Sequence, residues 1–390
     1  MLGVQLCEAA QIGLDRGQRV AHAQRQEVLR LALAPGLRQR VCPQPQQAVL
    51  VQRQRALGAG PQHEARVLRH WACARPQDAG RRRIEDFLPQ ALRAALPALS
   101  EELAAMARLQ SQHPGDDGSA RLLVALHDGQ TIESVLLPRD GLCVSTQVGS
   151  AVGCVFCMTG QGGLLRQLSG TEIVAQVALA RTLRPVKKVV FMGMGEPAHN
   201  LDAVMDSIQL LGTAGAIAHK NIVLSTVGDA RVFERLMALG PGDVRPALAL
   251  SLHSTQPALR EQLLPRAPRI TPVDLVAAGE RYARASGYPI QYQWTLIDGV
   301  NDGPDEIDGI VELLSGRYAL MNLIPSNTVD GLSLRRPSGE RLAQMARTLH
   351  QRGVLTKLRR SAGQDVDAGC GQLRARAVGA ALRHIPITAA

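Results

Sequence analysis

The sequence predicts an α/β protein, and three observations support that prediction. Six short apolar runs follow one another between residues 142 and 325, and an amphipathic stretch comes after each of them. Glycine-rich or polar segments separate the runs from the stretches, as loops do between strands and helices. Strands that alternate with helices in this way are usually parallel. The domain is therefore a partial (β/α)6 barrel or a doubly wound sheet.

The first part of the chain lacks this alternation. Residues 1–60 are rich in Gln, Arg, Ala and Leu without sustained periodicity, which predicts a basic and poorly ordered extension. Over residues 61–115 apolar residues recur at spacings of three and four, which is typical of a small helical accessory domain. Residues 116–138 alternate around Asp128-Gly129, a tight-turn dipeptide, and predict a β-hairpin linker.

The alternating pattern defines a core over residues 139–375, and a basic tail at 376–390 follows it. The expected strands span residues 142–148, 187–193, 221–227, 246–253, 290–297 and 318–325, and the expected helices span 171–183, 201–211, 230–240, 272–285, 305–316 and 339–353.

Composition limits the class of protein. With 390 residues and 45% hydrophobic content the chain can bury a sizeable core. Seven cysteines, no secretory signal and no apolar run near twenty residues favour a soluble protein of a reducing cytoplasm, with no membrane segment. The 44 Lys+Arg against 34 Asp+Glu favour a polyanionic partner such as nucleic acid, or else a solvated basic surface. Aromatic residues are 3% of the chain, which argues against rows of stacked bases.

Unusual polar residues follow the expected strands. In a parallel α/β barrel the carboxyl ends of the strands share one rim, where ligands bind. The spacing therefore predicts one site assembled from several loops, containing Cys154 and Cys157, the segment from Gly193 to Pro197, Ser225 and Thr226, Ser251 and His253, and Asn327.

The cysteine pair Cys154 and Cys157 admits several interpretations from the residues alone. Two buried small hydrophobic side chains are one, and a redox pair of the thioredoxin type is another. Half of a zinc site would require a second close pair, which the sequence does not supply.

Residues 142–177, with the sequence LCVSTQVGSAVGCVFCMTGQGGLLRQLSGTEIVAQV, resemble the core segment of the RlmN/Cfr family of radical S-adenosylmethionine (SAM) RNA (adenine) methyltransferases. The resemblance extends over roughly residues 62 to 375. It implies a partial (β/α)6 radical-SAM barrel with a small N-terminal helical accessory domain.

The resemblance also implies two cofactors, a [4Fe-4S] cluster and SAM. The family holds its cluster with a CxxxCxxC motif, and Cys154 and Cys157 match the second and third cysteines. This chain departs from the motif at Ser150, which occupies the first position. Thiolate is the normal ligand of such clusters, and a serine alkoxide is a harder and more basic one. Weak ligation by Ser150, ligation by another thiol and an inactive paralogue all stay open.

Further segments match the family in sequence. IESVLLP places Glu133 in the role of proton acceptor, and MGEP resembles the loop that binds the SAM amino group. LSTVG, LSLH and IPSN match other SAM-contacting segments. The SAM-binding residues implied by these matches are Gly195, Glu196, Ser225, Ser251, Leu252, His253 and Asn327.

Two further cysteines match the family. SAGQDVDAGCGQL resembles the loop that carries the methyl-bearing cysteine, here Cys370, and Cys143 matches the partner that forms a transient disulfide with it. The glycines beside Cys370 suit a mobile loop. Cys7, Cys42 and Cys73 match nothing in the family and are expected to be inert thiols.

The resemblance thus implies an RNA methyltransferase that modifies an adenine carbon, C2 rather than C8, in rRNA or else tRNA. Its partners would be RNA and a one-electron reductant such as flavodoxin or ferredoxin, and the chain would act as a monomer. The alternatives are a catalytically impaired paralogue, a non-enzymatic RNA-binding protein and a thiol-disulfide oxidoreductase.

Overall fold

The computed structural model describes residues 47–80, 83–327, 334–359 and 361–373. Most of the expected N-terminal extension and the expected basic tail at 376–390 lie outside these residues.

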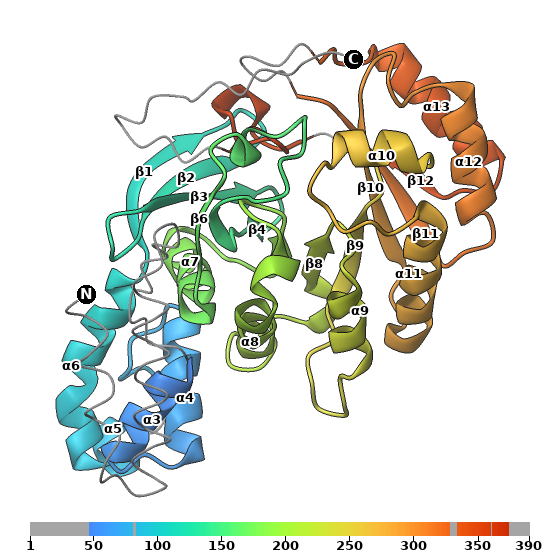
Figure 1. Ribbon diagram of the computed structural model, residues 1–390. Helices are drawn as coiled ribbons and strands as arrows, with labels where there is room; N and C mark the ends of the chain where they lie inside the picture. Colours follow the sequence, from blue (N-terminus) through green and yellow to red (C-terminus); the bar gives the residue numbers. More distant parts are fainter. Residues whose placement is uncertain (1–46, 81–82, 328–333, 360, 374–390) are drawn as a thin grey trace, which may run out of the picture. The chain divides into compact units, whose positions relative to one another are not determined.

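A single ten-stranded sheet runs through the described part of the molecule, in the order β1-β2-β3-β4-β7-β8-β9-β10-β11-β12 (Figure 1). From β4 onward the order in space follows the order in the chain, and every neighbouring pair is parallel. A doubly wound sheet would reverse its order at a switch point, and this one does not. The winding is therefore that of a partial barrel, open between β1 and β12.

The parallel strands from β7 to β11 closely match the expected ones, because short apolar runs bounded by loops are well marked in this chain, whereas β12 was not expected. The parallel strands are β4 (Gly141–Cys143), β7 (Lys188–Phe191), β8 (Ile222–Thr226), β9 (Ala247–Ser251), β10 (Ile290–Leu296), β11 (Ala319–Pro325) and β12 (Thr356–Leu358). The crossover helices are α7 (Gly170–Leu183), α8 (Leu201–Gly212), α9 (Ala230–Met237), α11 (Pro272–Ser286), α12 (Pro304–Leu314) and α13 (Gly339–Gln351).

The first expected strand, 142–148, was wrong in its length. The chain leaves the sheet after Cys143, because the Ser145 amide is bound by the Gln176 side chain (2.9 Å) and the Thr146 amide by the Met194 carbonyl (2.8 Å). The rest of the segment pairs in a separate two-stranded sheet. That sheet consists of β5 (Gln147–Gly149) and β6 (Leu164–Gln167).

Three antiparallel strands extend the sheet on its N-terminal side. They are β1 (Arg108–Pro114), β2 (Ala120–Ala125) and β3 (Thr131–Leu137), and β2 and β3 pair around the turn at Asp128-Gly129. The structure places β1 within the stretch for which helices were expected. The hairpin is part of the main sheet, because β3 pairs antiparallel with β4.

Four helices precede the sheet and share a small apolar core of their own. One of them, α3, lies in a stretch expected to be poorly ordered, so this part of the expected extension is corrected. Its signal is weak because only Leu50 and Gln54 of its described side chains are buried, which is about one residue per turn. The helices are α3 (Gln47–Ala56), α4 (Pro61–Ala72), α5 (Ile84–Phe87) and α6 (Gln90–Ala105).

The remaining elements are short and lie in the loops. No helix of the described residues is long and apolar enough to cross a membrane. The short elements are α10 (Pro257–Leu263), η1 (Met158–Gly160), η2 (Pro197–Asn200), η3 (His219–Asn221) and η4 (Gln364–Val366).

Candidate functional site

The cysteine loop, residues 149–163, is shaped by two close backbone approaches. Gly149 has φ +83°, and a Cβ at this position would lie 2.0 Å from the Gly163 carbonyl oxygen. The Ser150 amide donates to that same carbonyl at 3.0 Å, and its hydroxyl is buried. A side chain at position 149 would therefore displace Ser150, so glycine there fixes where the Ser150 hydroxyl lies.

The two cysteines of the loop sit in a desolvated environment. Burial raises the pKa of both thiols, and for Cys154 the neighbouring Cys157 raises it further. Arg260 opposes this effect, because its positive charge lowers the pKa of Cys154. Both cysteines are free thiols, and they are close enough to influence each other electrostatically.

The C-terminal loop, residues 361–373, packs directly against the cysteine loop. The Met158 amide donates to the Gly371 carbonyl at 2.7 Å, and the Thr159 hydroxyl donates to the Leu373 carbonyl at 2.6 Å. Gly371 has φ +82°, and a Cβ there would lie 2.5 Å from the Phe156 carbonyl oxygen. From the sequence, the glycines beside Cys370 were expected to make the loop mobile. The structure gives Gly371 a different role, which is to let two loops meet.

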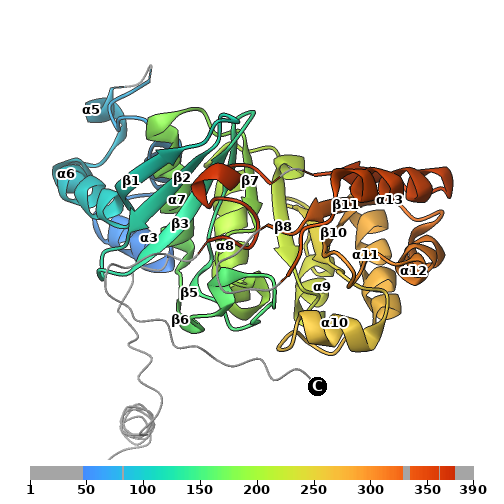
Figure 2. The ribbon, with the colours of Figure 1, turned by 90° about the horizontal axis from the view of Figure 1, so that it is seen from above.

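The other end of the C-terminal loop is tied to the β1–β2 turn. The Asp116 amide donates to the Asp365 carboxylate at 2.9 Å, and the Gly363 amide donates to the Asp117 carboxylate at 3.0 Å. Figure 2 shows this loop in red, lying beside β2 and β3. The loop is therefore anchored at both ends, with Cys370 near its end.

These contacts place three cysteines around one cavity of about 560 Å³, which we call the thiol cavity. Cys143 reaches it from the end of β4, Cys157 from the cysteine loop and Cys370 from the C-terminal loop. Burial and, to a smaller extent, the neighbouring Cys370 raise the pKa of Cys143 to about 12, so these two thiols lie close enough to influence each other. Both are free, so the disulfide expected between them is not formed in this structure.

Arg359 also lines the thiol cavity, and sequence reasoning missed it. It follows β12, a three-residue strand with no clear sequence signal, and its guanidinium donates to the Gln293 side chain at 3.2 Å. It is the group that lowers the pKa of Cys143 most, against the larger effect of burial. A cation is thus held beside a thiol that would have to ionise to react.

The loop after β7 contains a buried carboxylate, that of Glu196. Both oxygens of Glu196 accept hydrogen bonds, from the Thr226 hydroxyl at 2.6 Å, the Val227 amide at 3.0 Å and the Ala198 amide at 3.0 Å. Burial nevertheless raises the pKa of Glu196 to about 7. Gly195 precedes it with φ +102°, and a Cβ there would lie 2.6 Å from the Gln147 side chain. Glycine is therefore required at the point where the loop turns toward Glu196.

His253 follows β9 as a buried, neutral side chain. Its Nδ1 accepts from the Thr295 amide at 2.9 Å, and its ring packs edge-on against Phe156 at 4.8 Å between centroids. Burial and the positive charge of Arg260 lower the pKa of His253 to about 3. The Phe156 contact joins the cysteine loop to the end of β9. Leu252 beside it is fully buried.

The buried Arg260 was not singled out from the sequence. Its guanidinium donates to the Val227 carbonyl at 2.6 Å and to the Ser251 carbonyl at 3.1 Å, and it thereby joins the ends of β8 and β9. Ser225 and Ser251 are half-buried at these strand ends. A lone arginine in a seven-residue helix carries no sequence signal that distinguishes it from a solvated cation.

Asn327 lies between the carboxyl end of β11 and the C-terminal loop. Its amide nitrogen donates to the Cys370 carbonyl at 2.8 Å and to the Ser361 hydroxyl at 3.2 Å. Its carbonyl oxygen is buried without a partner among the described residues. An unpaired buried acceptor costs free energy, so this oxygen is suited to receive a donor from a bound ligand.

Glu133 lies next to the thiol cavity rather than in its wall. It is fully buried on β3 and forms an ion pair of 2.6 Å with Arg121 of β2. Val135, two residues further along the same strand, pairs with Cys143 and lines the cavity. Alternate residues of a strand share a face, so Glu133 faces the same side of the sheet as this lining.

The side chains present fit the two implied cofactors unequally. For SAM, the structure offers the Glu196 carboxylate and the unpaired Asn327 oxygen. For an iron-sulfur cluster, the cysteine loop offers two thiols and the Ser150 hydroxyl, and the described residues contain no group of three His, Cys, Asp or Glu side chains arranged to hold a metal. The donor set for a cluster is therefore one thiol short of the usual three.

Comparison with known proteins places the chain in a family. Residues 144–314 match the model of the radical SAM superfamily. A probable RNA methyltransferase of Methylibium petroleiphilum is 76% identical over 327 residues, which are 84% of this chain and 92% of that protein. One of Leptothrix cholodnii is 69% identical over 86% of this chain and 96% of its own length.

A solved structure supports the same placement at the level of the fold. The crystal structure of a radical SAM methyltransferase from Sphaerobacter thermophilus is 34% identical, with a TM-score of 0.72, over 85% of this chain and 98% of that one. The chain therefore belongs to the radical SAM superfamily of enzymes, in the family of these methyltransferases.

Proposed function

We propose that this enzyme methylates an adenine carbon of RNA by radical SAM chemistry, at C2 rather than C8, in rRNA or else tRNA. The observation that supports this most is the thiol cavity, where Cys143 and Cys370 meet next to the cysteine loop. The RNA substrate rests on the names of the relatives and on the net charge of +10.

The reaction needs a radical because these adenine carbons are not nucleophilic and cannot displace a methyl group from SAM directly. When bound, the cluster and SAM supply a carbon-centred radical by one-electron reduction, with a flavodoxin or ferredoxin as the proposed donor. Cys154, Cys157 and the Ser150 oxygen would hold the cluster. The residues proposed to hold SAM are Gly195, Glu196, Ser225, Ser251, Leu252, His253 and Asn327.

The protein's own groups would carry the methyl group and release the product. Cys370 presents its sulfur as the carrier, and Glu133 accepts the proton that the base carbon loses. The Cys143 thiolate then attacks the Cys370 sulfur: an S–S bond forms, the bond between that sulfur and the transferred carbon breaks, and the carbon keeps the electron pair and takes up a proton to become the methyl group on the base. Arg359 beside Cys143 favours that thiolate. Because the cavity is interior, the target base must leave its stack, which favours a loop or single strand.

SAM affinity is expected to depend on the charge of Glu196. Its pKa of about 7 means that the carboxyl is largely protonated at pH 6, and only the ionised form attracts the SAM ammonium group. Affinity measured by calorimetry should rise roughly 15-fold between pH 5.5 and 7, in proportion to the ionised fraction of the carboxyl. Glu196→Gln should bind SAM weakly with little pH dependence. Affinity of the unchanged protein that stays constant over this range would contradict the role.

The proposed reaction is tested by product analysis. Protein reconstituted anaerobically with iron and sulfide receives a one-electron reductant, methyl-labelled SAM and an unmodified rRNA transcript. Mass spectrometry of the digested RNA should then show labelled 2-methyladenosine, and reactions without reductant should show none. Labelled 8-methyladenosine would move the target to C8. RNA that is bound but never modified would support the impaired paralogue or the non-enzymatic RNA-binding protein.

A further inference from the structure

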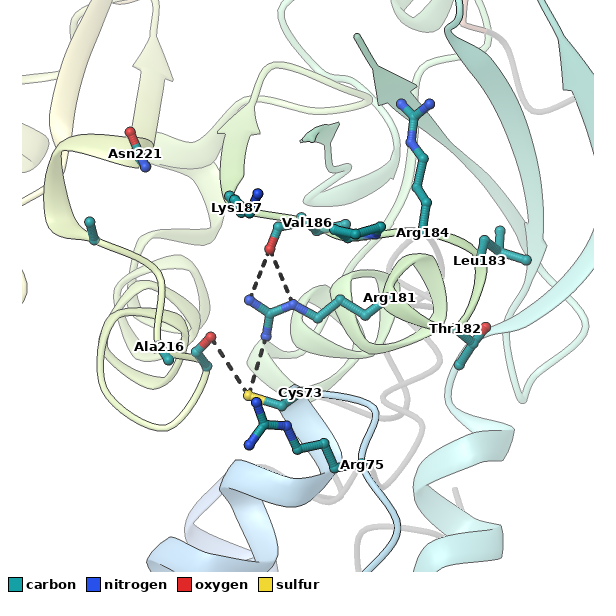
Figure 3. A pocket seen from close by; sticks show the side chains of 13 residues that line it. Cys73, Arg75, Arg181, Thr182, Leu183, Arg184, Val186, Lys187, Ala216 and Asn221 are labelled. Carbon is teal, nitrogen blue, oxygen red and sulfur yellow. Dashed lines mark hydrogen bonds between the residues drawn. The ribbon is translucent and has the colours of Figure 1, made fainter. Parts of the chain in front are cut away.

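A second cavity, of about 610 Å³, lies where the end of α4 meets the core, and we call it the basic pocket (Figure 3). Its lining comes from the turn after α4, the end of α7, the segment before β7 and the loop before β8. Four of the lining residues are cations, Arg75, Arg181, Arg184 and Lys187, and none is an acid. No step proposed above uses this pocket.

Two of the four cations, Arg181 and Arg184, are held in place by backbone carbonyls. Arg181 donates to the Ala72 carbonyl at 2.6 Å and to the Val186 carbonyl at 3.1 Å. Arg75 is exposed, and its guanidinium has no hydrogen-bond partner among the described residues. Burial lowers the pKa of Arg181, and the positive charge of Arg75 lowers it further against the influence of Cys73. Two guanidinium groups that repel each other favour an anion between them.

The basic pocket is connected to the thiol cavity through one arginine. Arg184 donates to the Gly118 carbonyl at 2.8 Å and also to the Leu137 carbonyl, and Leu137 lines the thiol cavity. Lys187 pairs at 2.8 Å with Asp140, which lies in the turn that joins β3 to β4. The two cavities therefore lie on either side of the turn that joins β3 to β4.

That turn has a strained backbone. Arg139 and Asp140 have φ of 60° and 59°, a conformation that glycine and asparagine adopt more readily. Arg139 is exposed and lines the thiol cavity. It adds a fifth cation, in the lining of the thiol cavity itself.

We propose that the basic pocket binds backbone phosphates of the RNA strand that delivers the target adenine to the thiol cavity. This inference rests on the proposed function and adds a binding site to it. Cations gathered in the basic pocket, with Arg139 in the lining of the thiol cavity, match an extended polyanion, whose phosphates repeat along the strand. A membrane surface would need several large exposed apolar side chains at the rim, and the only large one that the lining offers is Leu183, at 38% exposed.

The test is a charge reversal of the two most exposed cations, Arg75→Glu with Lys187→Glu. The matched control reverses two exposed arginines of other helices, Arg281→Glu with Arg347→Glu, and changes the net charge by the same amount. RNA affinity is measured by fluorescence anisotropy from 50 to 200 mM salt. The slope of log affinity against log salt should become shallower by about two in the pocket variant, and by far less in the control.

Further measurements distinguish the possible failures. Arg75→Gln with Lys187→Gln should also weaken RNA binding, but less than the charge reversal does. The thermal unfolding temperatures of all variants should match that of the unchanged protein. If the unchanged protein binds RNA and the pocket variant binds no worse than the control, the inference is wrong while the proposed function stands. Unchanged protein that binds no RNA would contradict the proposed function itself. Binding of phosphatidylglycerol vesicles that requires Arg75 and Lys187, with RNA affinity unaffected, would assign the pocket to membranes.

Discussion

Ser150→Cys is expected to raise both the iron bound per chain and the reductive cleavage of SAM. The cysteine loop offers only two thiols, and a neutral hydroxyl is a poor ligand for soft iron-sulfur clusters. Replacing oxygen by sulfur supplies the third thiol with little change in side-chain volume. After anaerobic reconstitution, the variant should approach about four irons per chain, and the unchanged protein should hold fewer or lose them on desalting.

The surroundings of Ser150 support a clean comparison. Its amide is fixed by the Gly163 carbonyl, so the backbone should present a thiol from the same position as the hydroxyl. Ser150→Ala is the matched control, since it removes the oxygen without adding sulfur. If the hydroxyl is a ligand, this control should bind less iron than the unchanged protein. A full and stable cluster in the unchanged protein, unaffected by Ser150→Cys, would show that oxygen or another thiol suffices.

The parallel core could be predicted from the sequence because each of its elements has a local pattern of apolar and polar residues. Strands such as β10 and β11 are short apolar runs, and the helices after them are amphipathic and bounded by loops. The carboxyl ends of parallel strands share one rim. Residues far apart in the chain, such as Glu196 and Thr226, could therefore be assigned to one site before their 2.6 Å hydrogen bond was seen.

Other features depend on contacts between distant segments and leave no local pattern. Arg359 becomes part of the thiol cavity because β12 adds to the edge of the sheet beside β11. The basic pocket requires the end of α4 to meet the end of α7, which no periodicity in either helix indicates. Gly371 looks like a flexible residue in the sequence. Its close approach to the Phe156 carbonyl is visible only once both loops are placed.

Cys143→Ala and Cys370→Ala are expected to fail in opposite ways. In the proposed reaction Cys370 carries the methyl group and becomes joined to the base, and Cys143 frees the product. Without Cys143 the covalent RNA-protein adduct should accumulate, because the other thiol of the cavity, Cys157, would hold the cluster and would not be free to break the sulfur–carbon bond. Without Cys370 no adduct should form. Labelled RNA on denaturing gels should shift with the first variant, remain unshifted with the second, and show no methyladenosine with either.

The structure sharpens this comparison because the two thiols differ in their surroundings. Cys143 is buried with its pKa raised to about 12, whereas Cys370 lies in a loop held by Asn327 and Met158. The double variant Cys143→Ala with Cys370→Ala serves as the control, since it should form no adduct even though Cys143 is absent. An adduct in the double variant would mean that another group, such as Cys157, attacks the base. Turnover by Cys143→Ala without any shifted band would mean that Cys143 does not release the product.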